Sequence, residues 1–184
     1  MMRSALLVID VQQSFEHQPF WSNDDLPAYQ AAQTALIRGC RERRVPVVQV
    51  FHHNLAADSL FNPARGLCVA QDWLPPEHDY RVIKQVHNAL TDSGLDAWLR
   101  RAGIDHLIIS GMRTEQCCET TARVASDLGY RIDFVSEATL TFAMPHPDGR
   151  EFSAAEIKAR TELVLNGRFA RVCSVAECLE SLQP

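Results

Sequence analysis

The stretch LLVIDVQQSF, residues 6–15, decides how the rest of the chain is read. An apolar run from Ala5 to Ile9 is typical of a strand that is buried on both faces, and it ends abruptly at Asp10. A buried carboxylate is costly unless it has partners. Asp10 is therefore either a surface loop residue or helix cap, or an active-site acid at the carboxyl end of a parallel strand, where open α/β sheets bind their ligands.

Short β-like runs alternate with helical stretches along the chain. Strands are expected at 4–10, 45–52, 80–84, 105–111, 131–138 and 169–174, and helices at 25–44, 91–103, 153–167 and 174–182. Residues 112–130 are expected to form a turn that runs into a helix ending near Gly129. This alternation predicts an α/β fold, with a mostly parallel sheet of about six strands covered by helices on both faces. The chain has 184 residues and no linker or repeat, so a single domain over residues 1–184 is expected.

Composition argues against several classes of partner. The net charge is −5 and no basic stripe is present, so nucleic acid is not an expected partner. The longest apolar runs fall short of the ~20 residues that a membrane helix needs, so no membrane partner is expected. The first apolar run meets Asp10 and does not resemble a signal peptide. The six cysteines form no C-x-x-C pair, which predicts reduced thiols and a cytoplasmic protein.

Three reactive side chains lie at the ends of predicted strands: Asp10 and Lys84 each end a strand, and Cys117 lies just beyond Gly111. The carboxyl ends of parallel strands lie at one edge of a sheet, so the fold can gather them. Cys117 falls at the start of a helix, where the helix N-terminus and a nearby ammonium are expected to lower the pKa of the thiol. Asp10 would accept the thiol proton, and Lys84 would stabilise both charges. Such a set suits acyl transfer through a thioester.

Each of these residues also has an ordinary explanation. A cysteine near a helix start is often a buried hydrophobic residue, and a lysine after a strand is usually solvated. A carboxylate and a lysine often form a simple ion pair. Only the coincidence of all three at strand ends favours a catalytic site.

The motif that contains Cys117 carries a family resemblance. The pattern G-x-x-T-x-x-C-x-x-x-T-A-R is matched by Gly111, Thr114, Cys117, Thr121, Ala122 and Arg123. With LLVIDVQQSF and RVIKQVHNAL, it resembles the isochorismatase-like cysteine hydrolase superfamily from the first strand to about residue 139. The resemblance implies a Rossmann-like three-layer αβα sandwich and a homodimer or homotetramer.

The resemblance also assigns roles to individual residues. It implies that Asp10, Lys84 and Cys117 form a catalytic triad. A non-proline cis peptide between Met112 and Arg113 would shape an oxyanion hole, with the backbone N–H groups of Arg113 and Cys117 as donors. The resemblance further implies that Cys118 is a core thiol and that Thr114 is a cap near the helix start. Thr121 would make a helix-face contact, and Asn88 would shape its loop.

Two departures from related subfamilies narrow the chemistry. Nicotinamidases of this superfamily carry D-x-H after the second strand to hold a metal, whereas this strand ends in QVFHHN. We expect neither a metal nor a cofactor, because no known ligand spacing is found among His52, His53, His78 and His87. True isochorismatases lack the nucleophilic cysteine. Its presence as Cys117 favours hydrolysis of a C–N bond.

The walls of a substrate pocket are expected from the segments around these strand ends. Candidate substrate-binding residues are Gln12, Phe15, Phe20, Trp21, Asn88 and the loop 53–79, which contributes Phe61 and Trp73. Phe61 and the tryptophans either form an aromatic wall or take part in ordinary loop packing. The Arg113 side chain either binds a substrate carboxylate or points to solvent.

The preferred interpretation is a cysteine hydrolase that cleaves a small carboxamide, ureide or N-carbamoyl substrate through a thioester. The alternative is a non-catalytic family member that uses the same pocket to bind a small ligand or a protein partner. An aspartate-based phosphatase is disfavoured, because Asp10 is followed by Val11 and Gln12 and not by a second aspartate.

Overall fold

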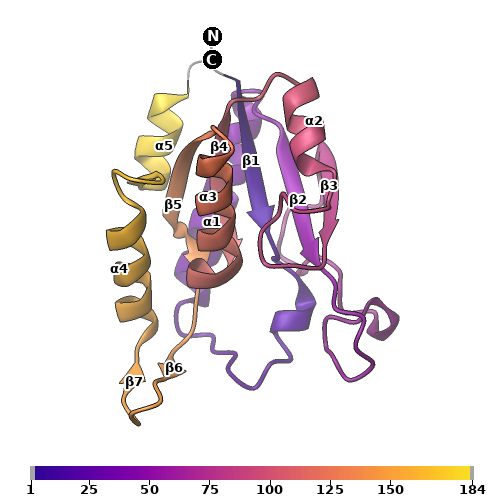
Figure 1. Ribbon diagram of the computed structural model, residues 1–184, viewed down its shortest axis with the longest axis vertical. Helices are drawn as coiled ribbons and strands as arrows, with labels where there is room; N and C mark the ends of the chain where they lie inside the picture. The colour runs from indigo at the N-terminus through magenta and orange to yellow at the C-terminus, as the bar shows by residue number, and fades with distance from the viewer. Residues whose placement is uncertain (1–2, 183–184) are drawn as a thin grey trace.

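The computed structural model describes residues 3–182 and has three layers, with a central sheet between two layers of helices (Figure 1). The sheet consists of β1 (Ser4–Ile9), β2 (Val47–His52), β3 (Tyr80–Lys84), β4 (His106–Met112), β5 (Arg131–Leu140) and β8 (Arg171–Cys173). The strand order is β3-β2-β1-β4-β5-β8, and every pairing is parallel. The predicted six-stranded α/β sandwich is confirmed.

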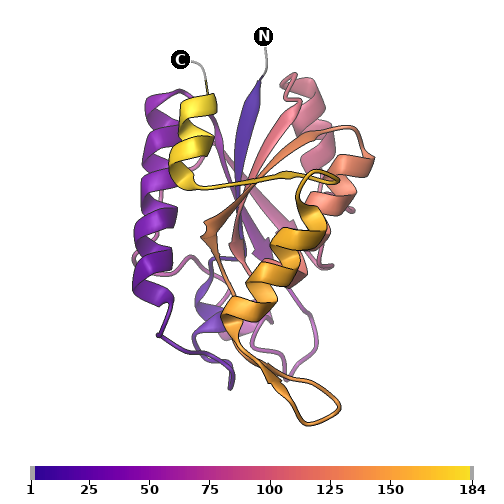
Figure 2. The same ribbon diagram turned by 90° about the vertical axis from the view of Figure 1, so that its left-hand side faces the viewer.

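The helices cover both faces of the sheet. The helices are α1 (Leu26–Glu42), α2 (Leu95–Arg101), α3 (Glu119–Asp127), α4 (Ala154–Leu165) and α5 (Val175–Ser181). Figure 2 shows α1 and α5 on one side of the sheet, with α2 and α3 on the other. A hydrophobic core lies on each face of the sheet, and alternate residues of β1 pack into one or the other. Leu6 and Val8 pack on the α1 side, and Leu7 and Ile9 pack on the α2 and α3 side.

The structure also contains elements that the sequence pattern did not predict. A small antiparallel hairpin of β6 (Met144–Pro145) and β7 (Glu151–Phe152) projects beyond the end of α4 (Figure 1). Two 3₁₀ turns, η1 (Gln13–Phe15) and η2 (Pro63–Arg65), lie in the loops after β1 and β2. Among the described residues, no helix is long and apolar enough to cross a membrane.

The segment 112–130, expected as a turn that runs into a helix, begins with a strand end and a π-helical turn. Met112 is the last residue of β4, a π-helical turn η3 spans Thr114–Cys118, and only then does α3 begin. The peptide bond between Met112 and Arg113 is cis, at the place where the family resemblance put it.

Gly111 permits a close approach between β1 and β4 just before this segment. Its φ is +119°, and a Cβ built at this position would lie 2.0 Å from the Ile9 carbonyl oxygen. Only glycine tolerates both the backbone conformation and the contact. The motif glycine therefore lets β4 end directly beside the residue that precedes Asp10.

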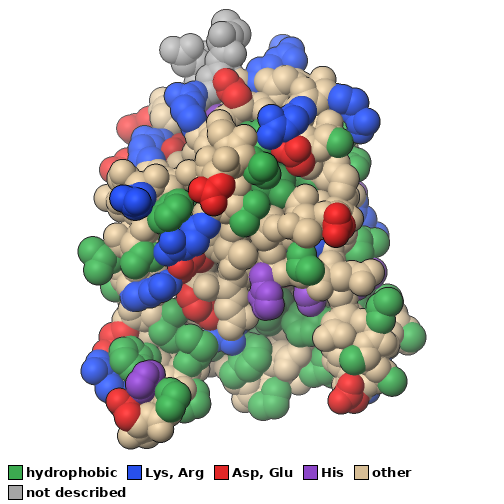
Figure 3. Space-filling model, viewed as in Figure 1, with side chains coloured by type: hydrophobic (Ala, Val, Ile, Leu, Met, Phe, Trp, Pro, Cys, Tyr) green, Lys and Arg blue, Asp and Glu red, His purple; other side chains and the backbone are tan. Residues whose placement is uncertain are grey.

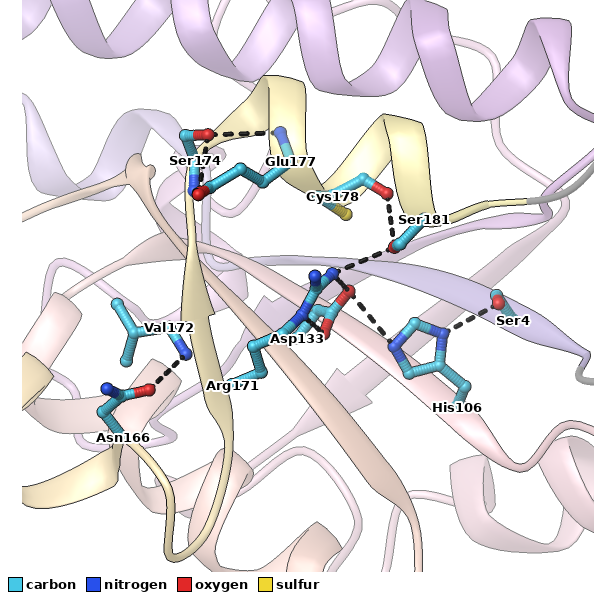
Figure 4. A network of polar contacts seen from close by, with 10 residues as sticks. All are labelled: Ser4, His106, Asp133, Asn166, Arg171, Val172, Ser174, Glu177, Cys178 and Ser181. Carbon is cyan, nitrogen blue, oxygen red and sulfur yellow. Dashed lines mark hydrogen bonds and ion pairs between the residues drawn. The ribbon is translucent and has the colours of Figure 1, made fainter.

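A polar network fixes the opposite, amino-terminal end of the sheet (Figure 4). Arg171 of β8 donates from Nε and Nη2 to the two oxygens of Asp133 on β5, at 2.8 and 2.6 Å, and also donates to Ser181 of α5 at 2.9 Å. His106 of β4 lies 3.4 Å from Asp133 and 2.8 Å from the Ser4 hydroxyl. This network joins residues at or near the start of four strands to the last helix, far from Asp10.

Candidate active site

Lys84 brings the three predicted reactive side chains together at the carboxyl end of the sheet. Its Nζ lies 2.7 Å from Asp10 Oδ2, 3.3 Å from Cys117 Sγ and 3.3 Å from His52 Nδ1. The three N–H bonds of the ammonium thus have three neighbours. The Lys84 and Asp10 side chains are 0% exposed, so their charges interact away from water.

Asp10 is held in a tight turn at the end of β1. Its φ is +55°, its N–H donates to Val50 at 2.8 Å, and its carbonyl accepts from the Gln12 N–H at 2.8 Å. Burial raises the pKa of the Asp10 carboxyl, although the Lys84 ammonium opposes this rise. One carboxylate oxygen, Oδ1, is buried and has no hydrogen-bond partner among the described residues. Asp10 is therefore a buried carboxyl group with one oxygen held by Lys84 and the other without a partner among the described residues.

Cys117 enters the site from the π-helical turn η3. The Cys118 N–H donates to the Arg113 carbonyl at 3.2 Å and so closes the turn. The Thr114 hydroxyl donates to Thr139 of β5 at 2.9 Å, so its predicted role as a helix cap is wrong. The Thr121 hydroxyl accepts from the Ala89 N–H at 3.0 Å, which is the helix-face contact that was expected.

The protonation state of Cys117 differs from the sequence-based expectation. A helix start and a nearby lysine were expected to lower the thiol pKa. Burial and the negative charge of Asp10 instead raise the pKa of Cys117, and they outweigh the Lys84 ammonium. The resting site therefore contains a neutral thiol beside a carboxylate and not a preformed thiolate.

His52 is a part of the site that sequence reasoning did not assign. It is the last residue of β2, in register with Lys84 on β3. Burial and the Lys84 ammonium lower the pKa of His52 to about 4, so its ring is neutral and can accept from Lys84. The signal available in the sequence was that His52 and Lys84 each end a predicted strand; their shared register is a finding of the structure.

Gln12 connects the ends of β1 and β2. Its Oε1 accepts from the His52 N–H at 2.8 Å, and its Nε2 donates to the His52 carbonyl at 3.1 Å and to Ser14 at 2.8 Å. Gln12 is fully buried. Its amide is engaged by the protein itself, so the geometry favours a role in positioning His52 over the substrate contact that was predicted.

An aromatic cluster lies over the carboxyl end of the sheet. Phe61 packs 5.4 Å from the His52 ring and 5.0 Å from Phe15, and Phe20 lies 5.3 Å from Phe142. Trp21 joins the cluster at 5.2 Å from Phe142. In Figure 3, hydrophobic side chains gather at the same lower end of the molecule. These rings give the site an apolar surrounding.

Trp73 does not belong to this cluster. Its ring packs edge-on against Tyr29 of α1 at 5.6 Å, and its indole N–H donates to Gln71 at 2.8 Å. For Trp73, the alternative of ordinary loop packing therefore holds.

Arg113 and Asn88 are both buried beside the site. The Arg113 side chain does not point to solvent, because the residue is only 6% exposed and its guanidinium stacks on Phe20. Asn88 accepts from the Leu90 N–H at 2.7 Å and donates to Thr91 within its own loop. Asn88 therefore shapes the loop after β3, and this geometry does not favour a substrate contact. Cys118 is fully buried in the core, as expected.

The residues around Cys117 do not fit a metal site of the nicotinamidase kind. Among residues 3–182, the group of His, Cys, Asp and Glu side chains close enough to share an ion is Asp133, Cys173 and Cys178. It lies in the network at the other end of the sheet, where Arg171 already binds both Asp133 oxygens. Near Cys117, His52 faces an ammonium instead of further ligands.

Comparison with known proteins identifies the family. The family model described as isochorismatase domain matches residues 4–177. The chain belongs to the isochorismatase family of hydrolases. Nicotinamidase 3 of Arabidopsis thaliana is 39% identical over 156 residues, covering 76% of this chain and 74% of that protein. Streptothricin hydrolase of Streptomyces noursei is 31% identical over 163 residues, covering 85% of this chain and 56% of that protein.

A solved structure agrees with this isochorismatase-family membership. The crystal structure of an isochorismatase-family protein from Chromobacterium violaceum has a TM-score of 0.89 and 28% identity, covering 98% of this chain and 93% of that one. The family match begins at the first residue of β1 and ends within α5, so it includes all six strands of the sheet. The family resemblance seen in the sequence is confirmed.

Proposed function

We propose that this isochorismatase-family hydrolase cleaves a C–N bond of a small carboxamide, ureide or N-carbamoyl substrate through a thioester on Cys117. The observation that carries the proposal is the contact of one buried ammonium, Lys84 Nζ, with both Asp10 Oδ2 and Cys117 Sγ. Relatives named nicotinamidase and streptothricin hydrolase support a hydrolytic reaction.

The first half of the proposed reaction forms the thioester. Cys117 Sγ attacks the carbonyl carbon while its proton moves to Asp10, whose Oδ1 has no other partner among the described residues. Backbone N–H groups of Arg113 and Cys117 would bind the oxygen of the tetrahedral intermediate. As the intermediate collapses, Asp10 returns the proton to the departing nitrogen, and an amine or ammonia leaves.

The second half of the reaction releases the acid. Asp10 takes a proton from a water molecule as that water attacks the thioester carbon, and the Cys117 sulfur leaves and regains the proton. Lys84 remains charged throughout, since the Asp10 carboxylate and the Cys117 sulfur raise its pKa enough to outweigh the effect of burial. It stabilises the negative charge on oxygen and on sulfur in turn.

Two adjacent cysteines provide the experiment with a matched control. Release of ammonia or amine is measured over a panel of primary amides, ureides and N-carbamoyl compounds with wild type, Cys117→Ala and Cys118→Ala. Cys117→Ala should abolish turnover, and Cys118→Ala should retain it because Cys118 is a core residue. An acyl adduct on Cys117, detected by mass spectrometry after rapid acid quench, would identify the thioester. Wild-type turnover by Cys117→Ala would overturn the proposal.

The alternative function is ligand binding without turnover, and the neutral thiol of Cys117 is compatible with it. Slow alkylation of Cys117 cannot separate the two functions, because burial and Asp10 raise the thiol pKa in either case. The same panel can separate them. A compound that raises the melting temperature of the wild type but yields no product would favour the binding function.

A further inference from the structure

Arg113 is a buried arginine whose hydrogen-bonding capacity is largely unused. The residue is 6% exposed, and arginines are rarely buried so deeply without full pairing. Its Nε and Nη2 atoms are buried and have no hydrogen-bond partner among residues 3–182. Leaving charged donors unsatisfied in an apolar surrounding is costly, and burial lowers the Arg113 pKa. The unused donors therefore point to a missing acceptor.

Glu115 balances the charge of Arg113 without satisfying its donors. Glu115 Oε1 lies 3.2 Å from Arg113 Nη2, yet both atoms lack a hydrogen-bond partner, so their contact has the distance of an ion pair without hydrogen-bond geometry. The other oxygen, Oε2, accepts from the Thr141 hydroxyl at 2.5 Å. Thr141 thus holds the Glu115 carboxylate near the guanidinium, but in a position where it does not accept hydrogen bonds from Nε or Nη2.

Two aromatic rings contact the guanidinium of Arg113 from one side. The Arg113 Cζ lies 4.6 Å from the Phe20 ring centre and 5.7 Å from that of Phe142. These two ring centres are only 5.3 Å apart, so both rings lie on the same side of the guanidinium. Arg113 directly precedes the turn Thr114–Cys118, and its carbonyl accepts from the Cys118 N–H at 3.2 Å, so Arg113 is joined to the turn that carries the nucleophile.

The same protein shows what the unused edge of Arg113 is able to bind. Arg171 uses the corresponding atoms, Nε and Nη2, to hold both oxygens of Asp133 at 2.8 and 2.6 Å. These two nitrogens lie on one edge of a guanidinium and match the spacing of a carboxylate. In Arg113, this is the edge that lacks partners.

We propose that Arg113 binds a carboxylate carried by the substrate, so that the preferred substrates are amido, ureido or N-carbamoyl acids and not neutral amides. This inference rests on the proposed function and names its substrate class. The scissile carbonyl would lie at Cys117, and the acid group would lie at the Arg113 edge, beside Phe20 and Phe142. Arg113 then determines specificity through its side chain.

The kinetic test uses matched pairs of substrates, each an acid and its neutral methyl ester or amide. We expect wild type to prefer the acid by roughly 100-fold in kcat/KM, because a neutral analogue would leave Nε and Nη2 of Arg113 without an acceptor. Arg113→Met should reduce this ratio to near one, whatever happens to the absolute rates. Arg113→Lys should give an intermediate ratio, since an ammonium cannot bind bidentately. Arg150→Met is the control, because Arg150 also stacks on an aromatic ring but is exposed on the β6–β7 hairpin.

Removal of Glu115 provides a second, opposite perturbation. Glu115→Gln removes the competing negative charge, so it should lower KM for the acids with little change for the neutral partners. If Arg113→Met fails to fold because Glu115 is left buried without a counter-charge, Arg113→Met/Glu115→Gln replaces it. An unchanged acid-to-neutral ratio in the Arg113 variants would overturn the proposal.

A binding measurement separates failure of this inference from failure of the proposed function. Calorimetric titration of the acids into Cys117→Ala measures affinity without turnover. Acids that bind Cys117→Ala but not Cys117→Ala/Arg113→Met would support the carboxylate site even if wild type released no product, in which case only the proposed reaction fails. Equal affinity of both proteins for the acids, or preferential binding of the neutral partners, would refute the role of Arg113 while leaving the reaction class untouched.

Discussion

Replacing Asp10 by asparagine tests whether the Asp10–Lys84 pair is truly buried. The pair has an N–O distance of 2.7 Å, and neither side chain is exposed. Asp10→Asn keeps the shape and removes the charge, so the ammonium is left with the Cys117 thiol and the His52 ring, which are both neutral. Removing one partner of a buried ion pair costs about 3–5 kcal/mol. For a chain of this length the melting temperature should fall by roughly 6–20 °C.

The destabilisation should depend on pH in a defined direction. Without Asp10, burial lowers the pKa of Lys84 below its unfolded value, so the folded state binds fewer protons than the unfolded state. The stability of Asp10→Asn should therefore rise as the pH increases from the lowered pKa of Lys84 in the folded state to its pKa in the unfolded state. Adding Lys84→Met removes the unpaired charge and should restore a large part of the lost free energy.

Urea unfolding followed by circular dichroism measures these effects at pH 7 and pH 9.5. The four proteins of the cycle are wild type, Asp10→Asn, Lys84→Met and the double variant, and we expect a coupling energy above about 2 kcal/mol. Asp96→Asn is the matched control, since it weakens a surface pair with Arg100 and should cost less than about 1 kcal/mol. A cost below about 1 kcal/mol for Asp10→Asn, additive with Lys84→Met, would mean that water reaches the pair and that the reasoning is wrong.

Two further predictions concern the ends of the sheet. Gly111→Ala should destabilise the protein by more than about 3 kcal/mol or prevent folding, because its Cβ would meet the Ile9 carbonyl oxygen at 2.0 Å. Soluble expression and thermal melting measure this effect. A melting temperature equal to that of wild type would contradict the prediction. Burial raises the pKa of Asp133, but hydrogen bonds from Arg171 and His106 outweigh this and hold it well below its ordinary value. The stability that Asp133 contributes is therefore present above about pH 4 and lost as the pH falls below that. Asp133→Asn should cost about 1–3 kcal/mol at pH 7 and progressively less toward pH 2, as measured by urea unfolding at each pH; a constant difference would contradict the assignment.

Periodicity and spacing predicted most of the fold, because both are local properties of the chain. The apolar runs placed all six strands, and the alternation with helices predicted their parallel arrangement. The π-helical turn Thr114–Cys118 was not predicted, because it is closed by hydrogen bonds between main-chain atoms and has no side-chain signature. The β6–β7 hairpin was missed for a related reason, since two residues in each strand are too few to show alternation.

The sequence predicted which residues lie at the site but not the protonation state of Cys117. Strand ends and motif spacing were enough to propose that Asp10, Lys84 and Cys117 meet. The direction of the Cys117 pKa shift was not predictable, because it depends on how fully the thiol is buried and on its distance from Asp10. The position of His52 beside Lys84 depends on strand register, and the burial of Arg113 depends on the loop that supplies Phe20. These are properties of the assembled sheet edge.

In the proposed reaction, the arrangement of charges would allow a buried thiol with a raised pKa to act as the nucleophile. Before proton transfer, the site holds the Lys84 ammonium and the Asp10 carboxylate. After transfer to Asp10, it holds the same ammonium and the Cys117 thiolate. The buried net charge is zero in both states, so the transfer creates no new unbalanced charge to desolvate. Because Nζ lies 2.7 Å from the carboxylate and 3.3 Å from the sulfur, Lys84 compensates the negative charge in either position without moving. In the proposed reaction, the Cys117 thiol would therefore be neutral at rest and ionised only during attack.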